Sequence, residues 1–534
     1  MRYPKFTLPD LLAATAVKSS RKTALVYFGT EISYAQLEDH VNRFAAGLQA
    51  LGLKRGDRVA LMMANCPQFV IAYFGVLRAG GIVTATSSMY TAREAAHQWN
   101  DAGAVMVVAD RKLQPVLEAA RPQLTTVRRI VLTGMREYFP RHFRQLCGAL
   151  KKTSSVRVSA EAKQPMDWLD LLRLARKPRP HGLKQSDIAC LQYTGGTTGT
   201  SKGAMLTHAN LVINACQANA WLMAGLSVDH VTTVAALPMF HIYAMTCVMI
   251  ATIELGGRII ILPRFELKAA LNLIRKYRPT IYHGVPTMYV AFNNAPNVKR
   301  YGFHSLRVCM SGGAPLPVEV RQKFEALTGG KLVEGYGLTE TSPVTHVNPP
   351  AGLCKTGSMG LTIADTEARM MDLENGTREM PLGEVGEIVI RGPQVMKGYW
   401  NKPEETALVL RDGWLYTGDI AKKDADGYYY IVDRKKDMII AGGYNIYPRE
   451  VEEVLFECPK VKEAGVVGVP DEYRGETVKA FVVLKAGVKA TVEEIVAFCR
   501  ERLAAYKVPR QVVFIDALPR SGVGKYLRRE LRNL

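Results

Sequence analysis

The sequence of 534 residues contains no Cys-x-x-Cys pair, and no histidine cluster accompanies any of its nine cysteines. This spacing argues against a zinc site or a disulfide framework, and it fits a reducing compartment. The most apolar stretch, 231–255, makes a poor membrane span because it contains Pro238, His241 and Glu254. The first thirty residues lack the apolar core of a signal peptide. These absences predict a cytoplasmic location.

Acidic residues are outnumbered: 49 Asp and Glu stand against 69 Lys and Arg, a formal net charge of +20. Such an excess indicates anionic partners, namely nucleotides and CoA, an anionic membrane face, or nucleic acid. The aromatic residues do not alternate with basic ones as a platform for stacked bases requires, and no nucleic-acid-binding module is recognisable. We therefore expect small anions and a membrane surface as partners, and no nucleic acid.

The chain is long enough for three or four folding units, and 48% hydrophobic residues with 22% charged ones indicate a globular protein. Short apolar runs alternate with amphipathic segments, which predicts a parallel sheet with helices on both faces. We expect a helix at 34–53 and strands at 58–65, 81–88, 105–110, 188–193, 258–263, 279–286 and 305–317.

The pattern changes after about residue 345, where alternating runs are broken by Asn-Gly, Asp-Gly and Ala-Asp-Gly turns. Such turns connect hairpins, so a small antiparallel β unit is expected there. The charged stretch 433–437 then separates this unit from a final module of about 100 residues. Helical and strand patterns mix in that module, which predicts a compact α+β lid.

The segment 136–163 combines an apolar helical stripe with basic residues around it. A basic amphipathic helix of this kind lies in lipid interfaces, so 136–152 is a candidate for contact with an anionic membrane. Two alternatives stay open, a surface helix packed by its apolar stripe and a loosely ordered insertion.

A loop rich in glycine and threonine, YTGGTTGTSKG, occupies 193–203 between an expected strand and a helical stretch that begins near His208. Glycines let the backbone approach a phosphate closely, and backbone amides, threonine hydroxyls and Lys202 can bind its oxygens. The loop is not a P-loop of the Walker type, since Gly203 follows Lys202 where that pattern requires Ser or Thr. This departure argues against a kinase or an ordinary ATPase.

The loop and seven later motifs together resemble the adenylate-forming superfamily of acyl-CoA synthetases, luciferases and peptide-synthetase adenylation domains. The later motifs, in the superfamily's order, are PMFH (238–241), SGGAPLP (311–317), GYGLTE (335–340), WLYTGD (414–419), DRKKDMI (433–439), GGYNIYPREVE (442–452) and PRSGVGK (519–525). The flanking segments are most similar to bacterial long-chain fatty acid–CoA ligases. The likeness covers nearly the whole chain and is weakest around 136–180.

The resemblance implies an α/β fold in which two doubly wound subdomains and a small antiparallel β subdomain form a large N-terminal domain. On this basis we expect that domain at 1–432, with the β subdomain at about 346–432. A hinge at 433–437, with Lys436 as its pivot, would lead to a mobile α+β domain at 438–534.

The resemblance also implies the cofactor Mg²⁺, the co-substrates ATP and CoA, and a set of site residues. Catalytic roles would fall to Lys525, Thr339, Glu340 and His241, and Thr198 with Glu340 would bind the metal. Nucleotide contacts would come from Thr194, Gly195, Gly196, Thr197, Thr198, Gly199, Lys202, Gly312, Gly313, Ala314, Gly335, Tyr336, Gly337, Asp419 and Arg434. Gly442 and Gly443 would line the path of CoA, and His241, Gly284, Val285 and Met288 would contact the acyl substrate.

The implied reaction joins a carboxylic acid to CoA through an acyl-adenylate, with release of pyrophosphate and AMP. The similarity to long-chain fatty acid–CoA ligases implies that this acid is a long-chain fatty acid. Expected partners are the fatty acid, ATP and CoA, an anionic membrane contacted peripherally at its inner face, and a second copy of the chain in a homodimer. Three alternatives stay open: a medium-chain or aryl acid–CoA ligase, a fatty acyl-AMP ligase that serves a carrier protein, and a membrane-associated fatty-acid binding or uptake protein without turnover.

Overall fold

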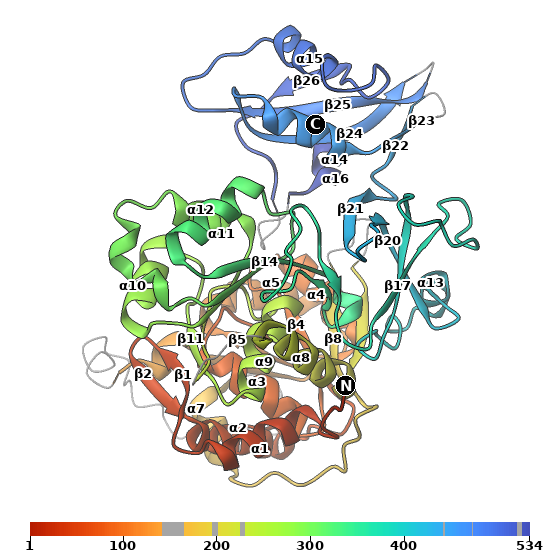
Figure 1. Ribbon diagram of the computed structural model, residues 1–534. Helices are drawn as coiled ribbons and strands as arrows, with labels where there is room; N and C mark the ends of the chain where they lie inside the picture. The colour runs from red at the N-terminus through yellow and green to blue at the C-terminus, as the bar shows by residue number, and fades with distance from the viewer. Residues whose placement is uncertain (141–164, 195–200, 225–229, 442–443, 472–473, 521–525) are drawn as a thin grey trace. The chain divides into compact units, whose positions relative to one another are not determined.

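The computed structural model describes residues 1–534 except 141–164, 195–200, 225–229, 442–443, 472–473 and 521–525. Contacts divide the chain into two compact units (Figure 1). Unit 1 comprises 1–366 and 391–410, and unit 2 comprises 367–390 and 411–534.

The first sheet of unit 1 has seven strands in the order β7-β6-β5-β3-β4-β8-β9. All neighbours are parallel except β8 and β9, which form an antiparallel pair. The strands are β3 (Arg58–Met62), β4 (Ile82–Thr86), β5 (Ala104–Asp110), β6 (Arg129–Thr133), β7 (Met166–Asp167), β8 (Ile188–Tyr193) and β9 (Gly203–Thr207). The expected strands in this region are confirmed. The strand β9 was not predicted, and it lies between the glycine- and threonine-rich loop after β8 and the helix predicted near His208.

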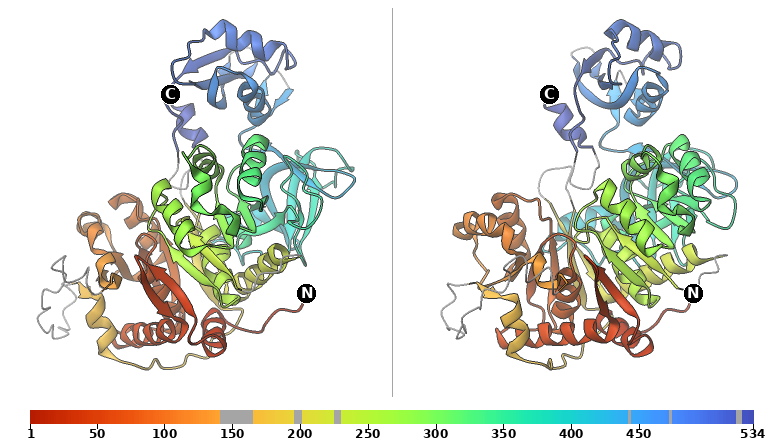
Figure 2. Two further views of the ribbon diagram at one scale, coloured as in Figure 1. Left: turned by 60° about the vertical axis from the view of Figure 1, so that its left-hand side comes forward. Right: turned by 90° about the vertical axis from the view of Figure 1, so that its left-hand side faces the viewer.

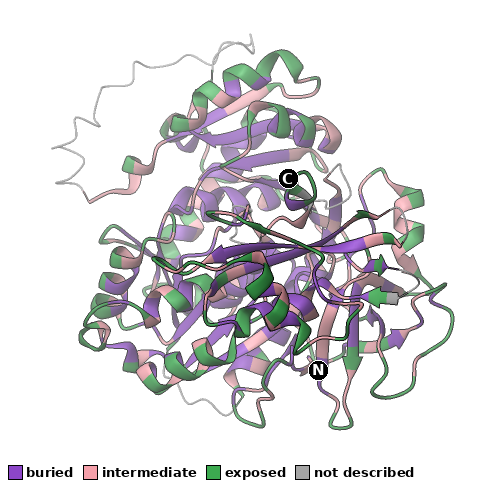
Figure 3. Ribbon diagram, turned by 90° about the horizontal axis from the view of Figure 1, so that it is seen from above, coloured by how far each residue is buried: buried purple, intermediate pink, exposed green. Residues whose placement is uncertain are grey.

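The second sheet of unit 1 has nine strands in the order β16-β15-β14-β13-β12-β10-β11-β1-β2, with β14 through β1 parallel. They are β1 (Thr23–Tyr27), β2 (Thr30–Ser33), β10 (Thr232–Ala235), β11 (Arg258–Ile261), β12 (Ile281–Gly284), β13 (Val308–Ser311), β14 (Lys331–Gly337), β15 (Val344–Val347) and β16 (Leu361–Thr362). Figure 3 shows the strands of unit 1 mostly as buried, as expected for parallel sheets covered by helices.

Helices connect the strands of unit 1, and capping side chains define where several begin. The expected helix at 34–53 is α2, whose first amides are satisfied by a capping box between Ser33 and Gln36. Thr207 and Asn210 cap α8 in the same way. The helices are α1 (Leu8–Lys18), α2 (Tyr34–Ala50), α3 (Pro67–Arg78), α4 (Ala92–Ala102), α5 (Gln114–Ala120), α7 (Trp168–Leu174), α8 (His208–Met223), α9 (Ala251–Glu254), α10 (Leu267–Tyr277), α11 (Pro286–Asn293), α12 (Val318–Thr328) and α13 (Pro403–Val409).

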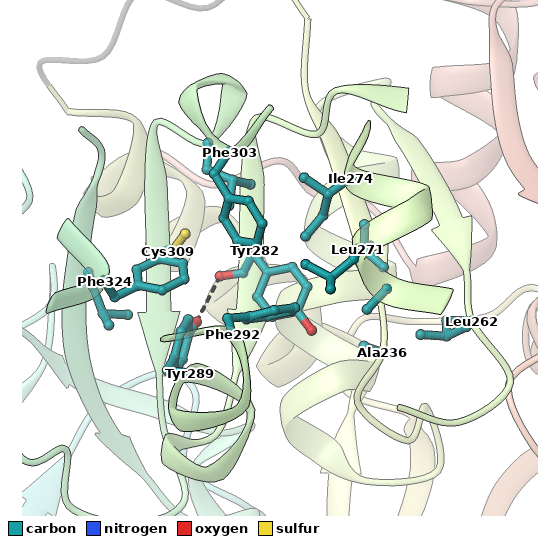
Figure 4. Packing of buried hydrophobic residues seen from close by; sticks show 14 of the residues in the cluster. Ala236, Leu262, Leu271, Ile274, Tyr282, Tyr289, Phe292, Phe303, Cys309 and Phe324 are labelled. Atoms are coloured by element: carbon teal, nitrogen blue, oxygen red, sulfur yellow. Dashed lines mark hydrogen bonds between the residues drawn. The ribbon is translucent and has the colours of Figure 1, made fainter. Parts of the chain in front are cut away.

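An aromatic core fixes the helices that cover the middle of the nine-stranded sheet. Tyr282 of β12, Phe292 of α11 and Phe324 of α12 pack edge to face around Phe303 and Tyr289 (Figure 4). Such pairs contribute about 0.5–1.5 kcal/mol each beyond the area that they bury. The core lies beneath the chain that follows β12 and β13, which carries several predicted substrate contacts.

Unit 2 contains the two remaining sheets, both seen in Figure 2. The first has the order β17-β18-β20-β19 with β21 paired to β20, and it confirms the predicted antiparallel unit. The second has the order β23-β22-β25-β24 with β26 paired to β25, and α14 packs on β24 as expected of an α+β module.

The strands of these two sheets are β17 (Glu367–Met371), β18 (Gly386–Arg391), β19 (Leu410–Arg411), β20 (Trp414–Lys423), β21 (Tyr429–Arg434), β22 (Ile439–Ala441), β23 (Tyr444–Ile446), β24 (Val461–Asp471), β25 (Gly475–Leu484) and β26 (Gln511–Phe514). The helices are α14 (Pro448–Glu457), α15 (Val492–Arg500) and α16 (Arg528–Arg532). The division by contacts places both sheets in one unit, so the hinge at 433–437 and its flanking domains stay a prediction.

Among the described residues, no helix is both long and apolar enough to cross a bilayer. The eight described cysteines are free thiols. Residues 141–152 of the predicted basic helix at 136–152 lie outside the described residues, and its described beginning falls in a 3₁₀ turn, Met135–Tyr138.

Candidate active site

The predicted site residues of unit 1 follow the carboxyl ends of four parallel strands. Thr194 comes after β8, Gly312 after β13, and Gly284 and Gly337 close β12 and β14. In open α/β sheets ligands bind at this edge, where loops leave the strands together. Residues 194 and 337, which are 143 positions apart in the sequence, therefore both lie at the carboxyl ends of parallel strands, one in each sheet of unit 1.

The loop after β8 is closed by a backbone bond from the Thr194 amide to the Lys202 carbonyl at 3.0 Å. Lys202 was predicted to bind phosphate oxygens. In the structure its ammonium forms an ion pair with Glu405 and lies 5.3 Å from the ring centre of Tyr399. The residues between, Gly195, Gly196, Thr197, Thr198 and Gly199, lie outside the described residues.

Glu340 lies in a 3₁₀ turn, Thr339–Thr341, directly after β14. Its side chain is half-buried, and its Oε1 accepts a hydrogen bond from the Tyr399 hydroxyl at 2.7 Å. Its carbonyl accepts the Met396 amide at 2.8 Å. Burial first, and the adjacent Glu340 carboxylate second, raise the pKa of Tyr399, so the hydroxyl keeps the proton that it donates.

The segment that carries Tyr399 runs along the edge strand β9. Lys397 donates its amide to the Met205 carbonyl at 2.9 Å, and Met205 donates back to the Gly398 carbonyl at 2.8 Å. Trp400 continues the pairing with a bond to the Gly203 carbonyl at 2.8 Å. The segment thus connects β9, the strand that follows the glycine- and threonine-rich loop, with the turn that contains Glu340.

His241 lies at the start of a helical stretch that contains a seven-residue π-helix, Ala244–Ile250. Its Nδ1 accepts the Tyr243 amide at 3.3 Å, so the neutral ring carries its proton on Nε2. Gln192 of β8 donates to the Phe240 carbonyl at 2.8 Å, which brings the end of β8 beside His241. π-Helical turns are frequent at functional sites because they displace side chains from regular helical register.

Three of the glycines predicted to contact nucleotide or acyl substrate are packed against neighbouring groups. A methyl group on Gly312 would meet the Tyr243 ring at 3.2 Å, and one on Gly284 would meet the Tyr289 ring at 3.1 Å. On Gly335 it would meet the methyl end of Met310 at 2.1 Å. These glycines are therefore closely packed in this conformation, so an added methyl group would require the neighbouring side chains to shift, and their contacts with nucleotide or acyl substrate stay predictions.

Gly337 has a stricter requirement. A methyl group there would lie 1.9 Å from the Pro343 carbonyl oxygen, a backbone atom that has no rotamer to change. Tyr336 beside it is half-buried, with its ring centre 5.8 Å from that of His346. The tight β14–β15 pair thus holds the aromatic residue that was predicted to contact the nucleotide.

The remaining predicted contacts of unit 1 lie near one another after β12 and β13. Gly313 has a left-handed φ of 80°, and a methyl group on it would be 3.8 Å from Val285. Ala314 is half-buried, whereas Met288 is buried in the first turn of α11. Val285 therefore faces the loop after β13 that was predicted to contact the nucleotide.

Asp419 and Arg434 occupy opposed positions on β20 and β21 in unit 2. The buried Asp419 carboxylate lies 3.3 Å from Nε of Arg434, so these two predicted nucleotide contacts pair with each other. The pKa of Lys436 is lowered to about 8, first by desolvation and then by the positive charge of Arg434. The other predicted residues of this unit, Gly442, Gly443 and Lys525, lie outside the described residues.

A charged cluster that motif comparison did not predict surrounds Arg528 in unit 2. Its guanidinium donates to Asp433 at 2.8 Å and to Glu452 at 2.7 Å, with Asp437 at 3.5 Å. Tyr526 donates to the same Glu452 oxygen at 2.5 Å. Its position three residues after Lys525 was the one sequence signal available for Arg528.

No group of three or more His, Cys, Asp or Glu side chains in the described part of the chain is arranged as a metal site. A single carboxylate such as Glu340 nevertheless suits Mg²⁺, because this ion commonly binds one protein carboxylate together with phosphate oxygens.

Comparison with known proteins identifies the chain's relatives over nearly its full length. The model of the AMP-binding enzyme family matches residues 12–400, and that of the AMP-binding enzyme C-terminal domain matches 450–525. A long-chain-fatty-acid–CoA ligase of Bacillus subtilis is 46% identical, over 99% of this chain and 94% of the relative. A feruloyl-CoA synthase of Amycolatopsis is 38% identical, over 96% of each. The crystal structure of ATP-bound MatB from Rhodopseudomonas palustris matches with a TM-score of 0.86 and 31% identity, over 99% of each chain.

Proposed function

The chain belongs to the AMP-binding enzyme family, and from this premise we propose that it ligates a long-chain fatty acid to CoA through an acyl-adenylate. The relative that supports the long-chain substrate is the Bacillus subtilis ligase, which matches almost the entire chain. The observation that carries the proposal is the gathering of Lys202, Tyr399 and Glu340 beside the loop after β8.

In the first step, a carboxylate oxygen of the acid attacks the α-phosphorus of ATP, and pyrophosphate leaves. The chain's task is to align these groups and to stabilise the negative charge that develops. Lys202 and the loop 194–203 would bind the departing phosphates, Thr339 the α-phosphate, and Lys525 the reacting oxygens. His241, with a proton on Nε2, would orient the carboxylate of the substrate.

Mg²⁺ would be held by Glu340 and Thr198, and when bound it would neutralise phosphate charge. Tyr336 with Gly312, Gly313 and Ala314 would enclose the adenine, while Asp419 and Arg434 would contact the ribose once their mutual pair opens. In the second step the CoA thiol attacks the acyl carbonyl and AMP leaves. A pivot at Lys436 would then remove Lys525 and present Gly442 and Gly443 to CoA.

The proposal is tested by following AMP and pyrophosphate release from purified protein supplied with acid, ATP and CoA. Formation of ADP in place of AMP would refute it. A Lys525→Ala variant should lose adenylation but keep thioester formation from supplied acyl-adenylate, because only the first step needs that ammonium. Equal loss of both steps would contradict the role of Lys525.

The feruloyl-CoA synthase among the relatives supports an aryl acid as the second candidate substrate. A panel of acids from C2 to C18 with benzoate and coumarate separates the two, since kcat/KM should rise toward long chains. Turnover that requires a carrier protein in place of CoA would favour a fatty acyl-AMP ligase. Fatty-acid binding without any AMP release would favour the uptake protein.

We also propose peripheral contact with an anionic membrane through 136–152, at the inner face, and a homodimer. Support for the membrane comes from the net charge of +20 and from Phe28, 53% exposed, whose ring centre lies 4.6 Å from that of Phe139. Deletion of 136–152 should reduce cosedimentation with phosphatidylglycerol vesicles, and unchanged binding would refute the contact. Analytical ultracentrifugation tests the dimer.

A further inference from the structure

Tyr399 has an unusually constrained position for a residue outside the helices and strands of unit 1. It is 9% exposed and forms a backbone bridge with Ala204 of β9. Its amide donates to the Thr406 hydroxyl at 2.9 Å, and that hydroxyl donates to the Lys402 carbonyl at 2.7 Å. These contacts hold the backbone of Tyr399 on both sides, so the position of the Cα atom that carries the side chain is fixed.

The same side chain contacts two predicted functional residues from different parts of the sequence. Its hydroxyl donates to Oε1 of Glu340 at 2.7 Å, a charge-assisted bond of normal length. Its ring centre lies 5.3 Å from Nζ of Lys202, within the range of a cation–π contact. A carboxylate with one oxygen held in this way has fewer directions in which its second oxygen can point.

We propose that Tyr399 is a positioning residue for the nucleotide site, which orients Glu340 through its hydroxyl and Lys202 through its ring. The inference rests on the proposed function, because it assigns metal binding to Glu340 and phosphate binding to Lys202. Outer partners that orient a metal ligand commonly contribute 10–100-fold to metal affinity. Tyr399 contributes at the lower end of this range, since phosphate oxygens supply the other ligands of the metal.

The test measures divalent-metal affinity directly. Mn²⁺ is titrated into the full-length protein with α,β-methylene-ATP, and free Mn²⁺ is counted by electron paramagnetic resonance. Tyr399→Phe removes the hydroxyl and keeps the ring, so Mn²⁺ should bind about tenfold more weakly. Binding of the same analogue in EDTA should change less than twofold, because the ring still supports Lys202.

Tyr3→Phe is the matched control, since the Tyr3 hydroxyl donates to Asp365 at 2.6 Å in the same unit, and its Mn²⁺ affinity should equal that of the wild type. A double-mutant cycle with Glu340→Gln adds a second readout, in which the two substitutions should be non-additive if Tyr399 acts through Glu340.

Two results would overturn the inference: wild-type Mn²⁺ affinity in Tyr399→Phe, whether or not its Tm falls, or additive effects in the cycle. A wild-type protein that binds no nucleotide analogue would overturn the proposed function itself, and this outcome is seen before any variant is compared.

Discussion

Replacement of Arg528 by Met should destabilise unit 2 far more than the loss of an ordinary arginine. The side chain of Arg528 is 14% exposed, and those of its partners Asp433 and Glu452 are 1% and 3% exposed. Met keeps most of the apolar length but removes the charge, so both carboxylates stay buried without their counterion. Breaking a buried pair from one side costs about 3–5 kcal/mol.

For a unit of this size, a loss of about 3–5 kcal/mol lowers Tm by roughly 6–20 °C. Differential scanning calorimetry gives the Tm, and hydrogen exchange of peptides from α14 and β24 locates the change in unit 2. Arg502→Met is the control, because Arg502 forms an exposed pair with Glu501 at 2.9 Å and should shift Tm by less than about 2 °C.

Part of the lost stability should be recovered when the unpaired carboxylate of Glu452 is also neutralised. In Arg528→Met with Glu452→Gln, the amide oxygen can still accept the Val466 amide, which donates to Glu452 at 2.9 Å. Recovery of a kilocalorie or so fits the coupling of neighbouring groups. If Arg528→Met melts within 2 °C of the wild type with unchanged exchange, the reasoning is refuted, because the cluster would then contribute no more than an exposed pair.

Three further predictions concern unit 1. Glu405→Gln should tighten ATP binding about three- to fivefold by releasing Lys202 from a partly exposed ion pair, and an unchanged Kd in calorimetry would contradict this. Gly337→Ala should lower Tm and weaken ATP binding, since its methyl group would lie 1.9 Å from the Pro343 carbonyl; wild-type values of both would show that the backbone adapts. Burial lowers the pKa of His208 to about 4, so the folded state resists the proton that the unfolded state takes up near pH 6.5, and stability falls as pH drops from 6.5 toward 4. His208→Gln should therefore lose less Tm between pH 7 and pH 5 than the wild type, and equal losses would assign the effect to other groups.

The strands of unit 1 could be predicted because each is a short apolar run that becomes fully buried in a parallel sheet. β5 is the clearest case, with all seven of its residues buried. The edge strand β9 was missed, since its five residues follow a glycine-rich loop and lead directly into α8. The π-helix, Ala244–Ile250, was also missed, because it differs from an α-helix in hydrogen-bond register and not in composition.

The sequence predicts site residues where a residue type is tied to the chemistry, as for Glu340 and the loop around Lys202, and these roles stay predictions. The partners of these residues were not predictable in the same way. The prediction that Gly337 contacts the nucleotide did not include its packing role. That role depends on how two antiparallel strands pair, because a methyl group on Gly337 would lie 1.9 Å from the Pro343 carbonyl oxygen. The local sequence indicates which groups a residue can contact, whereas the tertiary fold determines which residues become its neighbours.

Tyr399 and Arg528 share one property that explains why both were missed. Tyr399 lies 59 residues from Glu340, and Arg528 lies 95 residues from Asp433. The residue type of neither side chain indicates a catalytic role. Each side chain instead holds a charged residue that belongs to a recognised motif. Since motifs select groups that touch substrate, the residues that orient those groups are found by tracing the second hydrogen bond of each charged site residue. By this criterion the next variant to examine is Thr406→Val, which removes the hydroxyl that holds the Tyr399 amide and should reproduce, more weakly, the metal defect of Tyr399→Phe. Wild-type Mn²⁺ affinity in Thr406→Val would show that the backbone bridge to β9 alone fixes Tyr399.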